Sequence, residues 1–325
     1  MEIIHTPALP EETVELLSGA FRIFGNETGR DVLMIDSTLG EGGHSEAFLT
    51  RFPDIKIIGI DADKEIVSVA KRRLERFGER IVCHSAWADD FFAFYPKENA
   101  DRRPDIILID LGVSLFHYEK SGRGFSFRKD EALDMRIDTS RGESAAELLA
   151  GRSEREIARI LYEYAEERHS RRIARAVVQA RREAPVASSA RLAEIASLAL
   201  PAAARRGGGI HPATKTFQAL RIAVNGELER LPSLLASALS VLKTGGRLGV
   251  IAFHSLEDRI VKNFFREKAK DCVCPPSAPI CVCRGRRVAR LITSKAASPS
   301  RAEIEKNPRS RSAKLRVVEK VWNEE

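Results

Sequence analysis

Cysteine is scarce in this sequence, and long apolar runs are absent. Only five of the 325 residues are cysteine, which excludes the disulfide framework typical of small secreted proteins. No stretch approaches the roughly 18 uninterrupted apolar residues that a membrane-spanning helix needs. The first residues, MEIIHTPALPEETVELL, are acidic and lack the basic and apolar segments of a signal peptide. We therefore expect a cytoplasmic protein that does not contact a membrane.

Aromatic residues are also few, and acidic charge is outweighed by basic charge. Hydrophobic residues make up 43% of the chain and charged residues 30%, which indicates a globular protein of about two domains. The segment 284–325 holds 12 lysines and arginines against five glutamates, equal to the net charge of +7 for the whole chain. Clustered basic side chains bind nucleic acid by releasing counterions. This tail is therefore either a solvated surface that aids solubility or a contact for phosphates.

Short apolar runs alternate with helical periodicity in the first third of the chain. After the second run, Ile66, Ala70 and Leu74 share one face of a predicted helix. Buried strands separated by amphipathic helices are typical of a parallel sheet covered on both faces. The strand candidates are DVLMID (31–36), IKIIGID (55–61), RIVCHSA (80–86) and PDIILIDLGVS (104–114).

This alternation stops in the middle of the chain. Residues 136–209 contain no strand candidate and have the composition of helices rich in alanine, arginine and glutamate. A long helix is predicted from about Thr214, followed by a fifth strand in GGRLGVIAF (245–253) and two late strand candidates, ARLITSK and LRVVEKV. We therefore predict one α/β domain, residues 1–135 and 210–325, interrupted by an all-helical insert at 136–209.

The stretch STLGEGGHSEAF places glycines between the first strand and the next helix. Such a turn lets a nucleotide approach the backbone, although Gly40-x-Gly42-Gly43 departs from the G-x-G-x-x-G pattern. Asp61 ends the second strand about 20 residues later, where a carboxylate can accept both ribose hydroxyls. Its alternative role is the N-cap of the following helix. NAD and S-adenosylmethionine sites share this logic; Asp36 and the late strand pair favour S-adenosylmethionine.

Two further residues are candidates for catalysis. Asp110 follows the fourth strand at its carboxyl end, where open α/β sheets bind ligands. A carboxylate there can accept the N–H groups of an exocyclic amine and help it become a nucleophile, or it only shapes the pocket. His254, in HSLEDR after the fifth strand, either orients substrate and takes a proton or is a structural histidine. Arg221 and Asn225 share a polar helix face that is either solvated or lines the active-site cleft.

Two other motifs have open alternatives. Four cysteines in two C-x-C pairs suggest zinc, but structural zinc sites usually have C-x₂₋₄-C spacing, so we assign no metal; the alternatives are a reduced loop and oxidation-prone thiols. The insert segment ERHSRRIARAVVQARR forms either a solvated charged helix face or, in an enzyme that acts on folded RNA, a contact for phosphates and 2′-hydroxyl groups. The cysteines of the two pairs are Cys272, Cys274, Cys281 and Cys283.

Motifs along almost the whole chain resemble those of one enzyme family. They are HTPALPEE, DSTLGEGGHSEAF, GIDAD, IDLGVS, RGFSFRKDEALDMRID, GESAAELL, YAEERHSRRIARAVV, HPATKTFQALRIAVNGELE, GGRLGVIAFHSLEDRIVK and NPRSRSAKLR. The chain resembles the bacterial MraW/RsmH family of S-adenosylmethionine-dependent enzymes, which methylate N4 of a cytosine in the decoding region of 16S rRNA. The resemblance implies a Rossmann-like methyltransferase sheet interrupted by a helical insert, with S-adenosyl-L-methionine as the cofactor.

The resemblance also implies positions for cofactor contacts. Trp87 stands where the family usually has phenylalanine, a conservative change for a ring that stacks on adenine, and His117 stands where the family usually has glutamine. Leu115 and Phe116 replace a serine-proline pair, and the D-P-P-Y-like motif of many amino-methyltransferases is absent. The implied cofactor positions are Gly42, Gly43, His44, Asp61, Trp87, Asp110 and His117; we assign catalysis to Asp110 and His254.

We therefore expect an rRNA (cytosine-N4)-methyltransferase that uses 16S rRNA, within the small ribosomal subunit, rather than DNA. The helical insert would contribute rRNA recognition. The target cytosine must leave its stack to reach the methyl donor. The alternatives are an NAD-dependent oxidoreductase, against which the missing G-x-G-x-x-G pattern counts, and an RNA-binding assembly factor with a vestigial donor pocket.

Overall fold

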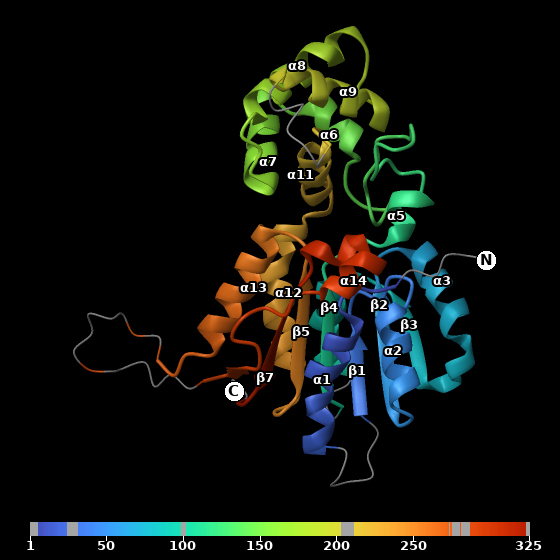
Figure 1. Ribbon diagram of the computed structural model, residues 1–325, viewed down its shortest axis with the longest axis vertical. Coiled ribbons are helices and arrows are strands. Elements are labelled where there is room, and N and C mark those ends of the chain that lie inside the picture. The colour runs from blue at the N-terminus through green and yellow to red at the C-terminus, as the bar shows by residue number, and fades with distance from the viewer. Residues whose placement is uncertain are drawn as a thin grey trace. The chain divides into compact units, whose positions relative to one another are not determined.

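The computed structural model describes residues 6–24, 32–98, 102–202, 211–272, 274, 280 and 287–322 (Figure 1). By its internal contacts the chain divides into two compact units. The first unit is formed by Met1–Gly112 with Arg230–Glu325, and the second by Val113–Glu229. Among the described residues, none of the helices combines the length and apolarity needed to cross a membrane.

The first unit is built on one seven-stranded sheet in the order β3-β2-β1-β4-β5-β7-β6 (Figure 1). The strands β1 to β5 run parallel, while β7 is antiparallel to both β5 and β6. The strand order reverses between β1 and β4, which is where sheets of this kind bind ligands. The strands are β1 (Val32–Asp36), β2 (Ile55–Asp61), β3 (Ile81–Ser85), β4 (Ile106–Asp110), β5 (Arg247–Ala252), β6 (Ala289–Leu291) and β7 (Lys314–Lys320).

Helices cover both faces of this sheet, because alternate residues of each buried strand point to opposite sides. Ile107 and Ile109 of β4 pack in one hydrophobic cluster with α4, α12 and α13, whereas Ile106 and Leu108 pack in another with α1, α2 and α3. The helices are α1 (Pro10–Phe24), α2 (Gly43–Arg51), α3 (Lys64–Leu74), α4 (Ala88–Glu98), α12 (Glu227–Val241), α13 (Ser255–Lys268) and α14 (Arg301–Lys306).

The second unit is helical and has a hydrophobic core of its own. Its helices α6 and α7 begin with capping boxes, in which Ser144 pairs with Glu147 and Ser153 with Glu156. The helices are α5 (Leu115–Glu119), α6 (Ala145–Gly151), α7 (Glu154–Ala165), α8 (Ser170–Glu183), α9 (Ser189–Ala199) and α11 (Thr214–Asn225).

The predicted α/β fold with a helical insert is confirmed, and so is the pairing of the two late strands. The second unit contains the whole predicted insert, 136–209, and extends beyond it on both sides to Val113 and Glu229. The extension includes α5 and α11. The domain boundaries and the role of the insert in rRNA recognition stay predictions.

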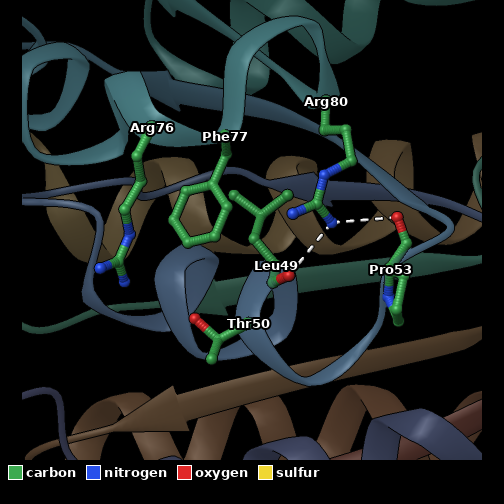
Figure 2. A pocket seen from close by; sticks show the side chains of 6 residues that line it. All are labelled: Leu49, Thr50, Pro53, Arg76, Phe77 and Arg80. Carbon is green, nitrogen blue, oxygen red and sulfur yellow. Dashed lines mark hydrogen bonds between the residues drawn. The ribbon is translucent and has the colours of Figure 1, made fainter.

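Arg80 closes the carboxyl end of α2. One guanidinium nitrogen donates to the carbonyl oxygens of Leu49, Phe52 and Pro53, each at 3.1 Å, and so satisfies carbonyls that a helix end leaves unpaired. The surrounding hollow has a volume of about 510 Å³ and lies beside the starts of β2 and β3, at the amino edge of the sheet. It is lined by Leu49, Thr50, Pro53, Arg76, Phe77 and Arg80 (Figure 2). The hollow is therefore explained by the way Arg80 caps the end of α2, and we assign it no ligand.

Candidate active site

Three aspartates lie at the carboxyl edge of the sheet. Asp36 ends β1, Asp61 ends β2 and Asp110 ends β4. These strands are neighbours and run parallel, so their carboxyl ends meet at the same edge. The sequence therefore places three carboxylates around the turn that follows β1.

Local backbone conformation and close packing explain why glycine occupies these positions of the turn. Gly40 and Gly42 adopt φ angles of 52° and 82°, in the left-handed region that favours glycine. A Cβ on Gly42 would lie 2.7 Å from Leu74, and one on Gly43 would lie 2.9 Å from Pro7. Gly42 is also the N-cap of α2 and offers no side chain to cap it. The turn is therefore packed tightly, and the first N–H groups of α2 are not capped by the residue before them.

Asp61 fastens this turn to β2. Its Oδ2 accepts a hydrogen bond from the Gly40 N–H at 2.8 Å, and its Oδ1 accepts one from the Asp63 N–H at 3.0 Å. The N-cap of α3 is Asp63, whose side chain accepts from the Glu65 N–H at 2.9 Å. The alternative that Asp61 caps this helix is therefore wrong. Each Asp61 oxygen has a second lone pair that can accept from a ligand hydroxyl.

Asp36 is the most deeply buried of the three aspartates, with 1% of its surface exposed. Its Oδ2 accepts a hydrogen bond from the Ser45 hydroxyl at 2.7 Å, while its Oδ1 has no hydrogen-bond partner among the described residues. Burial raises the pKa of Asp36 above its ordinary value of 3.8, against the opposing effects of His44 and Ser45; the charge of Asp110 adds to the rise. An unpartnered buried oxygen is costly, and a cationic ligand group would satisfy it.

Asp110 is held in place from three directions. Its Oδ1 accepts from the Gly112 N–H at 2.8 Å, and its own N–H donates to the Thr38 hydroxyl at 2.6 Å. Its Oδ2 lies 3.4 Å from Nε2 of His44, whose ring is 6% exposed and makes no hydrogen bond among the described residues. The structure thus brings His44 and Asp110 together, as the two cofactor predictions require. Thr38 was not predicted, because no local pattern distinguishes it from other turn residues.

Trp87 lies between β3 and α4. The guanidinium of Arg230 sits 4.1 Å from the centroid of its indole ring and also pairs with Asp89 at 2.5 Å. This cation–π contact covers one face of the ring. Because of Arg230, a purine would have to stack on the opposite face. Stacking of adenine on Trp87 stays a prediction.

His254 forms the N-cap of α13. Its Nδ1 accepts from the Glu257 N–H at 3.4 Å, and Glu257 Oε2 accepts from the N–H groups of Phe253 and His254 at 2.8 and 3.3 Å. This reciprocal arrangement is a capping box with histidine in the position usually taken by serine or threonine. The structure therefore supports the structural alternative for His254, and its catalytic role stays a prediction.

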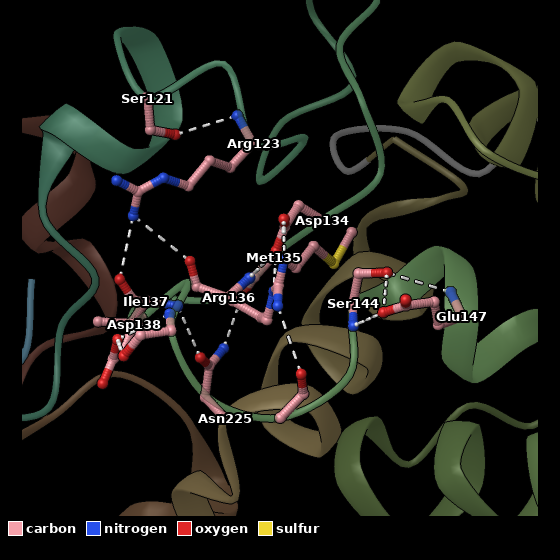
Figure 3. A network of polar contacts seen from close by, with 12 residues as sticks. Ser121, Arg123, Asp134, Met135, Arg136, Ile137, Asp138, Ser144, Glu147 and Asn225 are labelled. Atoms are coloured by element: carbon pink, nitrogen blue, oxygen red, sulfur yellow. Dashed lines mark hydrogen bonds and ion pairs between the residues drawn. The ribbon is translucent and has the colours of Figure 1, made fainter.

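The predicted site residues His117, Arg221 and Asn225 lie in the second unit. His117, on α5, is buried beside Phe116 and Phe125, and its cofactor contact stays a prediction. Asn225 accepts from the Ile137 N–H and donates to the Met135 carbonyl, both at 2.8 Å (Figure 3).

Arg221 also serves the packing of the second unit, because it pairs with Glu227 at 2.9 and 2.8 Å. The alternative that these two residues form a solvated face is therefore wrong. Their role in lining the active-site cleft stays a prediction.

The cysteine pairs are only partly described. The N–H of Cys274 lies 3.4 Å from the sulfur of Cys272, while Cys281 and Cys283 lie outside the described residues. No cluster of three metal-binding side chains occurs within the described part of the chain. The prediction of no metal thus stays a prediction.

Comparison with known proteins identifies the family of the chain. The model of the MraW methylase family matches residues 2–321. The chain belongs to the MraW methylase family. Its relatives include proteins named Ribosomal RNA small subunit methyltransferase H. The one from Treponema denticola is 52% identical over 99% of this chain and 98% of its own length. Those from Treponema pallidum and Syntrophobacter fumaroxidans are 43% and 45% identical, covering 98% and 97% of this chain and 93% and 96% of their own lengths.

This membership confirms the predicted family and the predicted methyl donor, S-adenosyl-L-methionine. A methylase family also excludes the alternative of an NAD-dependent oxidoreductase. Three of the motifs quoted for the family, DSTLGEGGHSEAF, GIDAD and IDLGVS, contain Asp36, Asp61 and Asp110 at the ends of β1, β2 and β4.

Replacing Asp36 with asparagine is expected to stabilise the protein in the absence of ligand. The pKa of Asp36 is raised in the folded protein. Its contribution to the free energy of unfolding is therefore fully present below pH 3.8, where the carboxyl is neutral. This contribution is lost as the pH rises through the raised pKa and the buried group ionises. At pH 8 the buried carboxylate is a penalty that asparagine removes. We expect a gain in the free energy of unfolding of about 1–3 kcal/mol, measured by urea denaturation. The gain should shrink as pH falls toward 4.

Asp54→Asn, at an exposed position just before β2, is the matched control and should leave stability unchanged at both pH values. A loss of stability in Asp36→Asn of equal size at pH 5 and pH 8 would contradict the assignment of a desolvated carboxylate.

Proposed function

We propose that the protein methylates the N4 amine of one cytosine in the decoding region of 16S rRNA, within the small ribosomal subunit. The observation that carries this proposal is the group of Asp36, Asp61 and Asp110 around the β1 turn, in a chain of the MraW methylase family. The relatives named Ribosomal RNA small subunit methyltransferase H support rRNA as the substrate.

The residues of the first unit fit the three polar parts of S-adenosyl-L-methionine. The unpartnered Oδ1 of Asp36 is suited to the ammonium group. The uncapped amino end of α2 is suited to the carboxylate, because backbone N–H groups and the helix dipole favour anions there. The Asp61 carboxylate, already oriented by two N–H groups, is suited to the ribose hydroxyls.

Asp110 is the residue best placed to assist the cytosine amine. The donor supplies an electrophilic methyl group on sulfur, and the amine nitrogen uses its lone pair to form the new N–C bond as the C–S bond breaks. That lone pair is delocalised into the ring, and a carboxylate that accepts the amine N–H groups makes it more available. Because Gly112 and Thr38 fix Asp110 beforehand, little reorganisation is needed at the moment of reaction.

The proton that leaves the amine also needs an acceptor. The Oδ2 of Asp110 and Nε2 of His44, 3.4 Å apart, form such an acceptor pair. In this proposal the Asp110 carboxylate takes the proton, His44 lies close enough to share it, and the proton passes to solvent after transfer. His254 is the second candidate for this role, although its ring already caps α13.

The proposal is tested by incubating the protein with labelled S-adenosylmethionine and small ribosomal subunits that lack this modification. The digested nucleosides are then separated and counted. We expect label in N4-methylcytidine, and less label when free 16S rRNA replaces the subunit. Label in another nucleoside would contradict the assignment of the amine. Tight donor and RNA binding without transfer would instead support an RNA-binding assembly factor.

A further inference from the structure

A second hollow lies on the helical unit, over α7 and α8. It has a volume of about 1250 Å³, and most of its lining is basic or aromatic. The two helices pack against the core through Ile157 and Ile173, which are fully buried. The hollow therefore lies on their polar faces. Its lining includes Arg155, Arg159, Tyr162, Arg168, Arg171 and Arg172.

The aromatic ring of Tyr162 lies among these basic side chains. Tyr162 is 61% exposed and is one of the few large aromatic side chains on the surface of the described residues. It follows Arg155 and Arg159 at intervals of seven and three residues, so all three lie on one face of α7. The ring is thus presented to solvent between arginines.

Four of the five arginines that line the hollow are unpaired in the described part of the chain, while the fifth, Arg159, lies 4.0 Å from Glu163. The side chains of Arg155, Arg168, Arg171 and Arg172 make no hydrogen bond or ion pair within the part of the chain that the structure describes.

Two carboxylates, Glu154 and Glu156, also line the hollow, and their partners are residues other than these four arginines. Glu154 pairs with Arg175 at 3.4 Å, Glu156 accepts from the N–H and hydroxyl of Ser153, and Glu167 accepts from the His169 N–H.

The position of two arginines adds to the positive potential. Arg171 and Arg172 lie in the first turn of α8, and the N-cap residue His169 provides no side-chain cap. Cations at this end of a helix are disfavoured by the helix dipole. An anion bound in the hollow would relieve both this repulsion and the mutual repulsion of the arginines.

Resting on the proposed action on rRNA, we propose that this hollow binds an unpaired stretch of the substrate RNA. One base stacks on Tyr162, and the adjoining phosphates bind Arg155, Arg168, Arg171 and Arg172. Exposed aromatic rings among arginines are the usual means of binding single-stranded nucleic acid, because every base has a face that can stack. Guanidinium groups bind phosphate oxygens in a bidentate manner. A paired duplex would keep its bases away from the ring.

The test measures affinity for a short labelled single-stranded RNA by fluorescence anisotropy over a range of salt concentrations. Arg171→Ala/Arg172→Ala should weaken binding at least about tenfold and reduce the salt slope by about 1.4, the value for two phosphates on a single strand. Tyr162→Ala should weaken binding at least about fivefold with the slope unchanged. Tyr162→Phe should restore the affinity, because phenylalanine also stacks.

The matched control is Lys71→Ala/Arg72→Ala, an adjacent exposed pair of cations on α3 in the first unit; its affinity should equal that of the wild type. Thermal unfolding checks that every variant is folded. Unchanged affinity in the Tyr162 and arginine variants, or an equal loss on duplex RNA, would overturn the proposal. So would a loss of binding to the small subunit with RNA binding intact, since that outcome points to a protein contact.

Failure of this inference can be distinguished from failure of the proposed function. If the wild-type protein methylates the subunit and the variants keep its KM, only the binding surface is wrong. If the wild-type protein transfers no methyl group while the variants still lose RNA affinity, the proposed reaction is wrong and the surface stands.

Discussion

Asp110→Asn is expected to slow methyl transfer by about 100- to 1,000-fold. This is the usual cost of removing one oriented polar group that acts on the reacting atoms. The amide can still accept from the Gly112 N–H, as Oδ1 does at 2.8 Å, so the local fold should survive. What is lost is the charge of the oxygen that lies beside His44. Single-turnover transfer to small subunits, with labelled donor in excess, measures the effect directly.

Two comparisons make the Asp110 result specific. Donor affinity, measured by calorimetry, should change far less than the rate, since the residue is expected to act mainly in the transfer step. Asp54→Asn removes the same charge from an exposed position at the amino edge of the sheet and should leave the rate unaltered. A rate for Asp110→Asn within threefold of the wild type would show that Asp110 only shapes the pocket.

Asp61→Ala is expected to weaken binding of S-adenosylmethionine by about 10- to 150-fold. This range corresponds to the net loss of one hydrogen bond to a charged group, about 1.5–3 kcal/mol, since every tenfold change in affinity is about 1.4 kcal/mol. Part of the loss reflects the turn itself, because Asp61 also holds the N–H groups of Gly40 and Asp63. Titration calorimetry with the purified protein measures the affinity.

An analogue of the donor without the ribose 2′-hydroxyl separates the two contributions. It should bind more weakly than the donor to the wild-type protein, whereas Asp61→Ala should no longer distinguish the two ligands. Asp63→Asn is the matched control, because asparagine is as good an N-cap as aspartate and the donor affinity should not change. Equal affinity of Asp61→Ala and the wild type would exclude the ribose assignment.

Much of the fold could be predicted from local patterns. The strand that ends at Asp61 and the helix after it differ in the period of their apolar residues, which is a property of neighbouring residues alone. The helical insert was recognisable from local composition as well, since residues 136–209 lack strand candidates and are rich in alanine, arginine and glutamate. Family motifs then extended the prediction from elements to an activity.

Side-chain partners were harder to predict, because they depend on segments distant in the sequence. Asp61 and Asp63 are both plausible caps for α3, and only the closure of the β1 turn onto β2 assigns Asp61 to Gly40 and leaves the cap to Asp63. Trp87 shows the same limit: its family position suggested adenine, but packing of the chain places Arg230 against its ring.

The sequence by itself determined the order of strands and helices, the three carboxylates at strand ends and the family, because periodicity, spacing and motifs are properties of the chain read in one dimension. The tertiary structure alone decided that Asp36 is buried with an unpartnered oxygen, that His44 meets Asp110, and that His254 caps α13. These features depend on which distant residues exclude water from a side chain or reach it with a hydrogen-bonding atom, and that is settled only when the sheet and its helices pack together.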